Sequence, residues 1–309
     1  MPRSSSPDFM IATEEKAARA TPPSCPSCGE CHPRALGAVA SRHADYGFAD
    51  GGDLFECPNC FLLFLDKPAR ANDASEMYEE LPANLLPESA GRRDFDLALE
   101  VTNAGARPLT VLDVGCFRGD FLQRLPETVT KFGIEPSREA RQMMAERGIQ
   151  LLGETTDTAV APDARFDFIY LMDVAEHLPN PLADIRKLAR WLKPGGKLII
   201  TTGNSDALPW RLSRLSYWYY LPQHLSFCNR RWFAWAAQES GLRLVRSTAF
   251  SHSRRAYGKM FVAERWRQFV KILIGRTSER LTGRRMFAHA VGTATWPDHI
   301  FVVLERGEN

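Results

Sequence analysis

The chain has 309 residues, of which 44% are hydrophobic and 25% charged, and its formal net charge is +2. This length and composition suit one full α/β domain with a smaller module, and so small a net charge excludes a general polyanion binder. No stretch reaches the ~18 unbroken apolar residues of a membrane span. Residues 1–20 mix Ser, Pro and both charge signs, so we expect a disordered tail without a signal peptide, and a cytoplasmic protein.

Two Cys-x-x-Cys pairs follow this tail. They are Cys25 with Cys28 and Cys57 with Cys60. Two such turns can present four thiolates to one structural Zn²⁺, which leaves no open position for catalysis. Residues 21–70 are therefore predicted to form a zinc ribbon of short strands, one of them over residues 61–65, with reduced cysteines or a redox pair as the alternative. The neighbouring Cys31 and His32 are alternative ligands.

Residues 71–105 are predicted to form a linker and a leading helix, and residues 106–250 an α/β core. The first strand of this core leads into Asp113-Val114-Gly115-Cys116-Phe117-Arg118-Gly119, which we interpret as a glycine loop between a buried strand and a helix. Gly115 permits a tight turn, Gly119 allows the helix to pack closely, and backbone N–H groups at the helix start can meet a polar ligand. A second strand over residues 131–134 ends at Glu135, whose carboxylate can accept two hydrogen bonds from a vicinal diol.

The glycine loop, the acidic end of the second strand and two later strands, over residues 166–174 and 198–200, resemble the class I S-adenosylmethionine-dependent methyltransferases. The resemblance covers residues 93–250 and implies a Rossmann-like sheet with helices on both faces. Phe117 departs from the pattern, because the family usually has its middle glycine there. A dinucleotide fold that binds NAD and an α/β core without a ligand are alternatives, although a dehydrogenase would be expected to show G-x-G-x-x-G. The resemblance implies S-adenosylmethionine contacts at Asp113, Gly115, Cys116, Gly119, Glu135, Met172 and Asp173.

The fourth strand is followed by residues 171–181, which resemble the acidic, Glu-His segment of the same family. The carboxyl ends of parallel strands face the ligand crevice, so His177 is a candidate base for a hydroxyl acceptor. Similarity to ubiquinone-biosynthesis O-methyltransferases implies instead a divalent cation at Asp173, Glu176 and His177. A third interpretation is that Glu176 and His177 fix the loop by hydrogen bonds. His224 is a second candidate base or a structural histidine.

An aromatic cap is predicted over residues 206–228, either as a lid over the acceptor or as a cap that buries its own rings. Residues 242–245 and 299–304 are predicted to be the last, antiparallel strands. Residues 251–309 thus hold that final strand after a basic helical insertion, with ten Lys or Arg against two Glu between residues 251 and 290. An apolar stripe at helical spacing comprises Val262, Trp266, Phe269, Val270 and Leu273. This stripe would serve packing against the core, dimerisation, or contact of residues 256–274 with a membrane surface. The oligomeric state is left open.

A zinc ribbon ahead of such a core resembles bacterial methyltransferases of types 11 and 23, which are commonly tied to glycan, quinone or secondary-metabolite modification. We therefore predict methyl transfer from S-adenosylmethionine to a small or carrier-linked acceptor, at oxygen. One alternative is an rRNA or tRNA methyltransferase. The ribbon carries just two cations between its first and last cysteine, Arg34 and Arg42, whereas a phosphate-binding face should be basic. The other alternative is a non-catalytic cofactor-binding protein of the same fold.

Overall fold

The computed structural model describes residues 23–39, 52–66, 91–105, 107–221, 223–252, 259–282 and 296–308. The predicted tail and most of the predicted linker lie outside these residues. Within the described part, no helix is long and apolar enough to cross a membrane.

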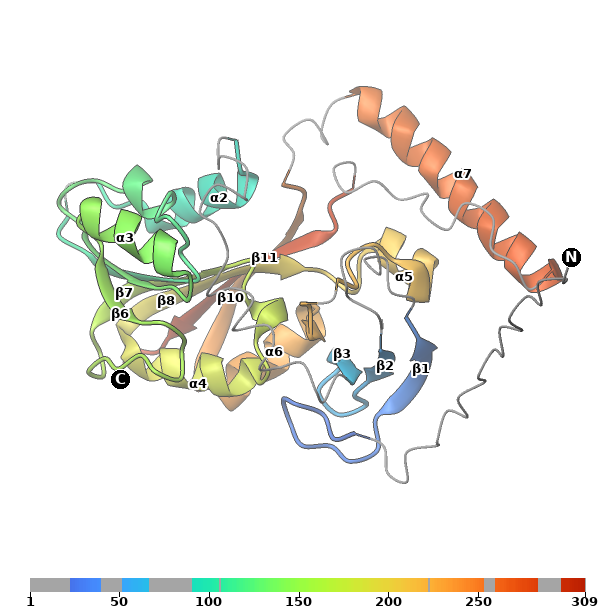
Figure 1. Cartoon of the computed structure of the whole chain (residues 1–309), viewed down its shortest axis with the longest axis horizontal. Helices are drawn as coiled ribbons and strands as arrows, with labels where there is room; N and C mark the ends of the chain where they lie inside the picture. The colour runs from blue at the N-terminus through green and yellow to red at the C-terminus, as the bar shows by residue number, and fades with distance from the viewer. Residues whose placement is uncertain are drawn as a thin grey trace, which may run out of the picture.

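A seven-stranded mixed sheet forms the centre of the protein (Figure 1). Its strands in chain order are β4 (Thr110–Val114), β5 (Thr130–Ile134), β6 (Gln150–Gly153), β7 (Phe166–Met172), β8 (Leu192–Gly203), β10 (Leu242–Phe250) and β11 (His299–Arg306). Across the sheet the order is β10-β11-β8-β7-β4-β5-β6. Strands β4, β5, β6, β7 and β8 run parallel, and β11 runs antiparallel to both of its neighbours. The carboxyl ends of β4, β5, β7, β8 and β10 therefore share one edge with the start of β11.

Helices cover both faces of this sheet, as predicted (Figure 1). They are α2 (Arg93–Thr102) and α3 (Arg138–Glu146) on one face, and α4 (Pro181–Trp191) and α6 (Arg230–Glu239) on the other. Local sequence explains where the helices begin, because Ser137, Asn180 and Asn229 each accept a hydrogen bond from a backbone N–H in the first turn. Pro181 follows its cap at a position where a missing N–H costs nothing.

The predicted helix after the glycine loop is wrong. The chain forms only the short 3-10 turn η2 (Leu122–Arg124) before it extends at Leu125. Pro126 comes next and disfavours a helical conformation at the residue before it, so a longer helix cannot continue. The loop therefore offers backbone N–H groups but no helix dipole.

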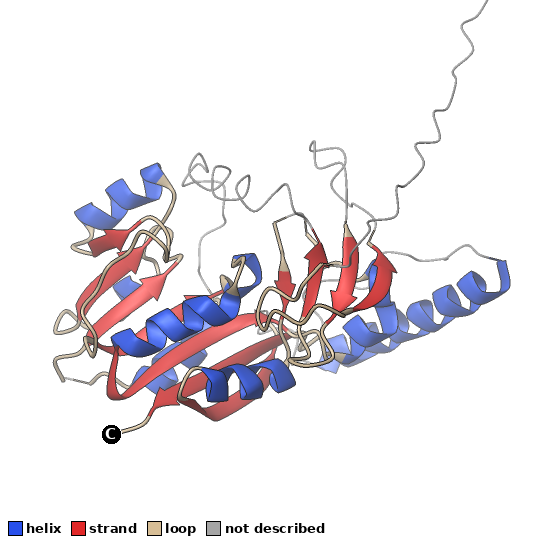
Figure 2. Ribbon diagram, turned by 90° about the horizontal axis from the view of Figure 1, so that it is seen from below, coloured by secondary structure: helices blue, strands red, loops and turns tan. Residues whose placement is uncertain are grey.

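The N-terminal module is a ribbon whose sheet is completed by a strand of the core. Its sheet contains β1 (Arg34–Ala38), β2 (Asp53–Glu56), β3 (Leu63–Asp66) and β9 (Ser226–Phe227), in that order. Strand β9 belongs to the predicted cap, so one sheet joins segments about 160 positions apart: Leu63 pairs with Phe227. Figure 2 shows this small sheet beside the large one. The ribbon and the core are thus joined by main-chain hydrogen bonds.

The cap also contains α5 (Leu208–Ser213) and the 3-10 turn η4 (Arg214–Ser216). Its rings pack on one another and on the ribbon residues Val39, Leu54 and Leu65. The buried rings are those of Trp210, Tyr217, Tyr219, Tyr220 and Phe227. Of the two interpretations of the cap, the structure matches the one in which it buries its own aromatics.

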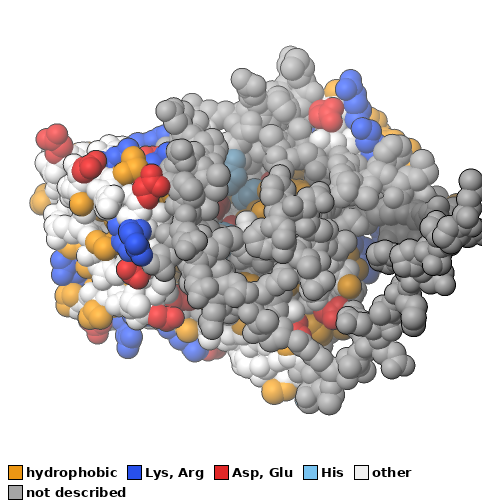
Figure 3. All heavy atoms as spheres, in the orientation of Figure 1, with side chains coloured by type: hydrophobic (Ala, Val, Ile, Leu, Met, Phe, Trp, Pro, Cys, Tyr) orange, Lys and Arg blue, Asp and Glu red, His pale blue; other side chains and the backbone are white. Residues whose placement is uncertain are grey.

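The basic insertion forms a long helix, α7 (Lys259–Thr282), which lies beside α5 and away from the large sheet (Figures 1 and 2). At the upper right of Figure 3, where the described surface is visible, basic and hydrophobic side chains lie next to each other. Gln268 and Ile272 are its buried contacts, and Gln268 accepts a hydrogen bond from the indole of Trp296 at 2.7 Å. Val262 and Trp266 are 64% and 66% exposed. The prediction that the apolar stripe packs against the core of this chain is therefore wrong.

Candidate active site

The glycine loop has the shape that its sequence predicts. Gly115 and Gly119 take the left-handed φ values of 68° and 75°, which suit glycine. A Cβ at Gly119 would lie 2.2 Å from the Ile149 Cδ1 atom, and one at Gly115 would lie 2.6 Å from Val174. Both positions therefore favour glycine for the turn, and a Cβ at either one would also push a neighbouring side chain aside.

Phe117 supplies the same backbone conformation where the family usually has glycine. Its φ is 48°, in the left-handed region that a bulky residue rarely adopts. Its N–H donates to the Oε2 atom of Glu135 at 2.7 Å, and the Arg118 guanidinium lies over its ring. The departure therefore leaves the loop intact, at the cost of local backbone strain.

Glu135 stands at the end of β5 and is 4% exposed. Besides Phe117, the N–H of Ser137 donates to its Oε1 atom at 2.9 Å. Burial raises the pKa of Glu135, although these two N–H groups act in the opposite direction. Asp113 lies in the neighbouring strand β4 and is also buried, and burial raises its pKa well above the usual range. Two carboxyl groups thus lie beside the loop at the edge where the strands end.

Cys116 and Met172, which were predicted to contact the cofactor, have buried side chains. The Cys116 Sγ atom lies 3.4 Å from the Met144 Sδ atom, and burial raises the pKa of its thiol. Met172 packs in the same hydrophobic cluster. Contacts from these two residues to a ligand at this edge would use the backbone, and a nucleophilic role for Cys116 has no support.

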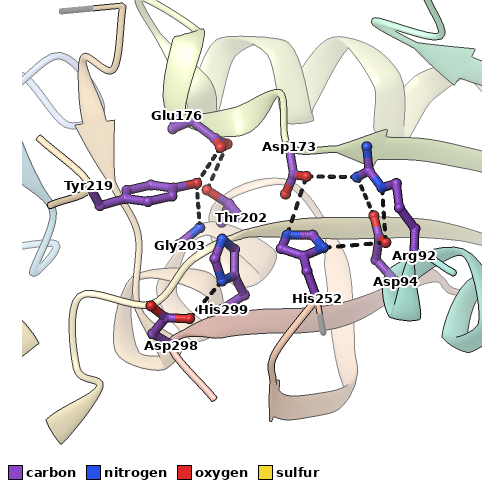
Figure 4. A network of polar contacts seen from close by, with 10 residues as sticks. All are labelled: Arg92, Asp94, Asp173, Glu176, Thr202, Gly203, Tyr219, His252, Asp298 and His299. Carbon is purple, nitrogen blue, oxygen red and sulfur yellow. Dashed lines mark hydrogen bonds and ion pairs between the residues drawn. The ribbon is translucent and has the colours of Figure 1, made fainter. Parts of the chain in front are cut away.

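A second group of candidates surrounds the 3-10 turn η3 (Ala175–His177), directly after β7. Glu176 is 1% exposed and accepts hydrogen bonds from the Tyr219 hydroxyl and, at 2.7 Å, from the Thr202 hydroxyl (Figure 4). Burial and the adjacent carboxylate raise the pKa of Tyr219, which stays a donor. Glu176 therefore joins η3, β8 and the cap, as the hydrogen-bonding interpretation predicts.

His177 and His224 lie together, with ring centroids 4.7 Å apart. The Nδ1 atom of His177 lies 3.1 Å from the Gln223 carbonyl, and that of His224 lies 2.8 Å from the Tyr219 carbonyl. A carbonyl oxygen can only accept, so Nδ1 carries the proton in both rings. In the neutral form, each Nε2 atom therefore has the lone pair that a base needs.

Asp173 does not join these histidines, although the family resemblance placed it in a cation site with Glu176 and His177. It turns instead toward Arg92, at 2.7 Å, and His252, at 3.4 Å (Figure 4). Burial alone would raise its pKa, but these two cations outweigh burial and hold the pKa below its usual range. Within the described residues, the predicted cation set is thus divided between two separate groups.

The sequence analysis missed the partners of Asp173. Asp94 completes the group, with ion pairs to both Arg92 and His252. Burial would lower the pKa of His252, but the two aspartates outweigh it and raise the pKa to about 10. His252 lies two residues beyond the end of β10, so the rule that strand ends share one edge could have indicated it. Arg92 and Asp94 lie at the start of α2, and no sequence motif there indicated that they would contact Asp173.

The four predicted cysteine ligands form a compact cluster. The distance between the Sγ atoms is 3.5 Å for Cys25 and Cys60 and 3.4 Å for Cys28 and Cys57, and all four lie within 4.8 Å of one another. Zn–S bonds of ~2.3 Å imply sulfur separations of ~3.8 Å in a tetrahedron, so the set is compatible with one structural zinc ion. The two alternative ligands, Cys31 and His32, are exposed and lie outside the cluster.

The second cysteine turn is held by the core. Phe61 takes a φ of 66° after Cys60, where Gly29 takes 74° after Cys28 in the first turn. The Asn229 side chain donates to the Phe61 carbonyl at 2.8 Å, and the Arg231 guanidinium lies 3.5 Å over its ring. The start of α6 thus supports a strained residue beside a candidate zinc ligand.

Part of the chain is similar to known proteins. A family model described as a methyltransferase domain matches residues 78–247, which is more than half of the chain. A ubiquinone biosynthesis O-methyltransferase of Xanthomonas euvesicatoria is 39% identical over 109 residues, 33% of this chain and 44% of that protein. A protein of the same name from Xanthomonas campestris is 37% identical over 121 residues, 37% of this chain and 49% of that protein. Among solved structures, the YcgJ protein of Bacillus subtilis is 17% identical with a TM-score of 0.47, over 70% of this chain and 99% of that one.

The chain therefore belongs to the methyltransferase domain family. The enzyme class that the sequence predicted, an S-adenosylmethionine-dependent methyltransferase, is confirmed at the level of this family. The chain spans about half the length of the curated relatives that it matches.

Proposed function

We propose that this protein transfers the methyl group of S-adenosylmethionine to a hydroxyl oxygen of a small or carrier-linked acceptor. The observation that carries the proposal is the edge of the sheet where β4, β5 and β7 end. A glycine loop with two buried carboxyl groups lies at this edge. His177, which follows β7, and its neighbour His224, which belongs to the cap, each have an Nε2 atom that can accept a proton.

The cofactor half of the proposal rests on Glu135 and the glycine loop. The carboxylate of Glu135 already orders the N–H groups of Phe117 and Ser137, and each of its oxygens has a further lone pair for a ribose hydroxyl. Charged hydrogen bonds of this kind are stronger than neutral ones, and they require Glu135 to be ionised. The family resemblance assigns the methionine end of the cofactor to the glycine loop that contains Gly115 and Gly119, and this assignment is part of the proposal.

The acceptor half of the proposal rests on His177, with His224 as its neighbour. S-Adenosylmethionine carries an activated methyl group, so the enzyme mainly has to align the acceptor and remove its proton. The acceptor oxygen forms the new bond to the methyl carbon, the carbon–sulfur bond breaks toward sulfur, and the hydroxyl proton passes to the Nε2 atom of His177. The products are a methyl ether and S-adenosylhomocysteine.

A ring-hydroxylated acceptor, such as a quinone precursor, is the acceptor class that the named relatives favour. The buried rings of the cap do not stack on it, because they are packed among themselves. We assign the four cysteines to one structural zinc ion, which would hold the ribbon against this cap. A nucleic-acid acceptor finds no support in the described ribbon: Arg34 is paired with Glu56, and Arg42 lies outside the described residues.

Methyl transfer tests this proposal directly. The protein is incubated with methyl-labelled S-adenosylmethionine and ring-hydroxylated, sugar and amine acceptors, and the position of the label is read by mass spectrometry. We expect a methyl ether on a ring hydroxyl, which His177→Ala reduces and His32→Ala, an exposed histidine of the ribbon, does not. Methylation of carbon or nitrogen with no ether product would overturn the assignment to oxygen.

A further inference from the structure

Two further histidines converge on Asp173 at the same edge of the sheet. His252 lies two residues beyond the end of β10, and His299 is the first residue of β11. Their ring centroids lie 4.3 Å apart, and one donor atom from each of the three residues lies within 4.8 Å of the others. Neither histidine has a part in the methyl transfer proposed above.

Each of these histidines is oriented by a buried carboxylate behind it. The Nδ1 atom of His299 lies 2.9 Å from Asp298, and the Nδ1 atom of His252 lies 3.5 Å from Asp94 (Figure 4). Asp94 and Asp298 are 0% and 1% exposed. A carboxylate on Nδ1 fixes the ring and makes the other nitrogen a better metal ligand, and this pairing is the usual one behind metal-bound histidines.

Asp173 offers an acceptor that nothing in the described part of the chain satisfies. Its Oδ2 atom contacts Arg92, but its Oδ1 atom is buried without a hydrogen-bond partner among the described residues. A buried acceptor without a partner costs about 1 to 3 kcal/mol. Asp173 also has a φ of 59°, so the strained backbone directs the side chain toward the histidines.

The local charge favours a dication. Around the two histidines lie the carboxylates of Asp94, Asp173 and Asp298 and the guanidinium of Arg92. With both imidazoles neutral, as metal ligands must be, this group has a formal charge of −2. We propose that Asp173, His252 and His299 form a binding site for a divalent transition-metal ion, with two imidazole ligands and one carboxylate. Such a set suits ions such as Co²⁺ or Zn²⁺ and leaves coordination positions open.

This site differs from the cation set that the family resemblance implied. Asp173 is common to both, but the other two ligands come from β10 and β11 instead of η3. If the proposed function holds, an open position at this edge could bind an acceptor oxygen and lower the pKa of its hydroxyl. The binding of the ion itself does not depend on that function.

The test is a calorimetric titration of the full-length protein with Co²⁺ after its ribbon has been loaded with zinc. We expect one Co²⁺ site beyond the ribbon. His252→Gln and His299→Gln should each weaken binding at least tenfold, because each removes one of three protein ligands. His32→Ala is the control and should leave the affinity unchanged.

Two further measurements keep the outcomes separate. Visible spectra distinguish cobalt on nitrogen and oxygen ligands from cobalt that has entered the thiolate cluster, and titration with S-adenosylhomocysteine shows that each variant is folded. Protein that binds S-adenosylhomocysteine but no additional Co²⁺ would overturn the proposed site. So would binding that His177→Ala abolishes and His252→Gln leaves unchanged, because the ion would then lie at η3. Binding of Co²⁺ by protein without any methyl transfer would refute the proposed function and leave the metal site standing.

Discussion

Replacing Glu135 with Gln should weaken the binding of S-adenosylhomocysteine by roughly 10- to 150-fold. The change removes the charge that two ribose hydroxyls would meet, and lost hydrogen bonds to a charged group cost about 1.5 to 3 kcal/mol. The glutamine amide also cannot accept from both Phe117 and Ser137, whose N–H groups now donate to the two carboxylate oxygens at 2.7 and 2.9 Å. Part of the loss therefore comes from disorder of the glycine loop.

Isothermal titration calorimetry measures this effect, with Glu139→Gln as the matched control. Glu139 is exposed in the first turn of α3, so its substitution makes the same change in net charge. The raised pKa of Glu135 adds a pH test: the affinity should fall as the pH drops, starting above the usual value near 4.5, and the variant should lack this dependence. An affinity that Glu135→Gln leaves within twofold of wild type would refute the placement of the ribose at β5.

Three further substitutions have distinct expected outcomes. Cys57→Ser should lose about one zinc ion per chain by elemental analysis, and its acceptor turnover should fall more than its cofactor affinity. Cys31→Ser should keep the metal. Retention of zinc by Cys57→Ser would refute the proposed zinc site in the ribbon. His177→Ala should lower turnover by about 10² to 10⁴ with cofactor affinity nearly unchanged, and near-normal turnover with a lower melting temperature would leave this histidine a structural role. Gly119→Ala should lower the free energy of unfolding by about 1 to 3 kcal/mol in chemical denaturation and weaken cofactor binding, because its Cβ would meet Ile149. The control is Gly148→Ala, where φ is similar but the space is open. This control should lower the free energy of unfolding less and leave cofactor binding unchanged.

The parts of the fold that local pattern specifies could be predicted. Buried parallel strands are continuous apolar runs, so β7 and the apolar part of β8 stood out, and the antiparallel pair at the end of the chain was also found. The glycine loop and the cysteine pairs could be predicted because their chemistry depends on short spacings. The four thiols do lie together.

The remaining features depend on contacts between distant segments. The pairing of β3 with β9 joins the ribbon to the cap through two short strands that no periodicity indicates. Arg92, Asp94 and His252 meet Asp173 because the start of α2 and the residues after β10 reach the end of β7 at the same edge of the sheet. The stripe on α7 has the spacing of a buried face, but Ile272 and Gln268 are the side chains that the fold covers.

The central claim is that this sheet edge binds S-adenosylmethionine, and calorimetric titration of the wild-type protein with S-adenosylhomocysteine and with NADH tests it most directly. We expect S-adenosylhomocysteine to bind with a dissociation constant in the micromolar range, roughly −8 kcal/mol, and NADH to give no comparable signal. Tight binding of NADH with none of S-adenosylhomocysteine would contradict the account.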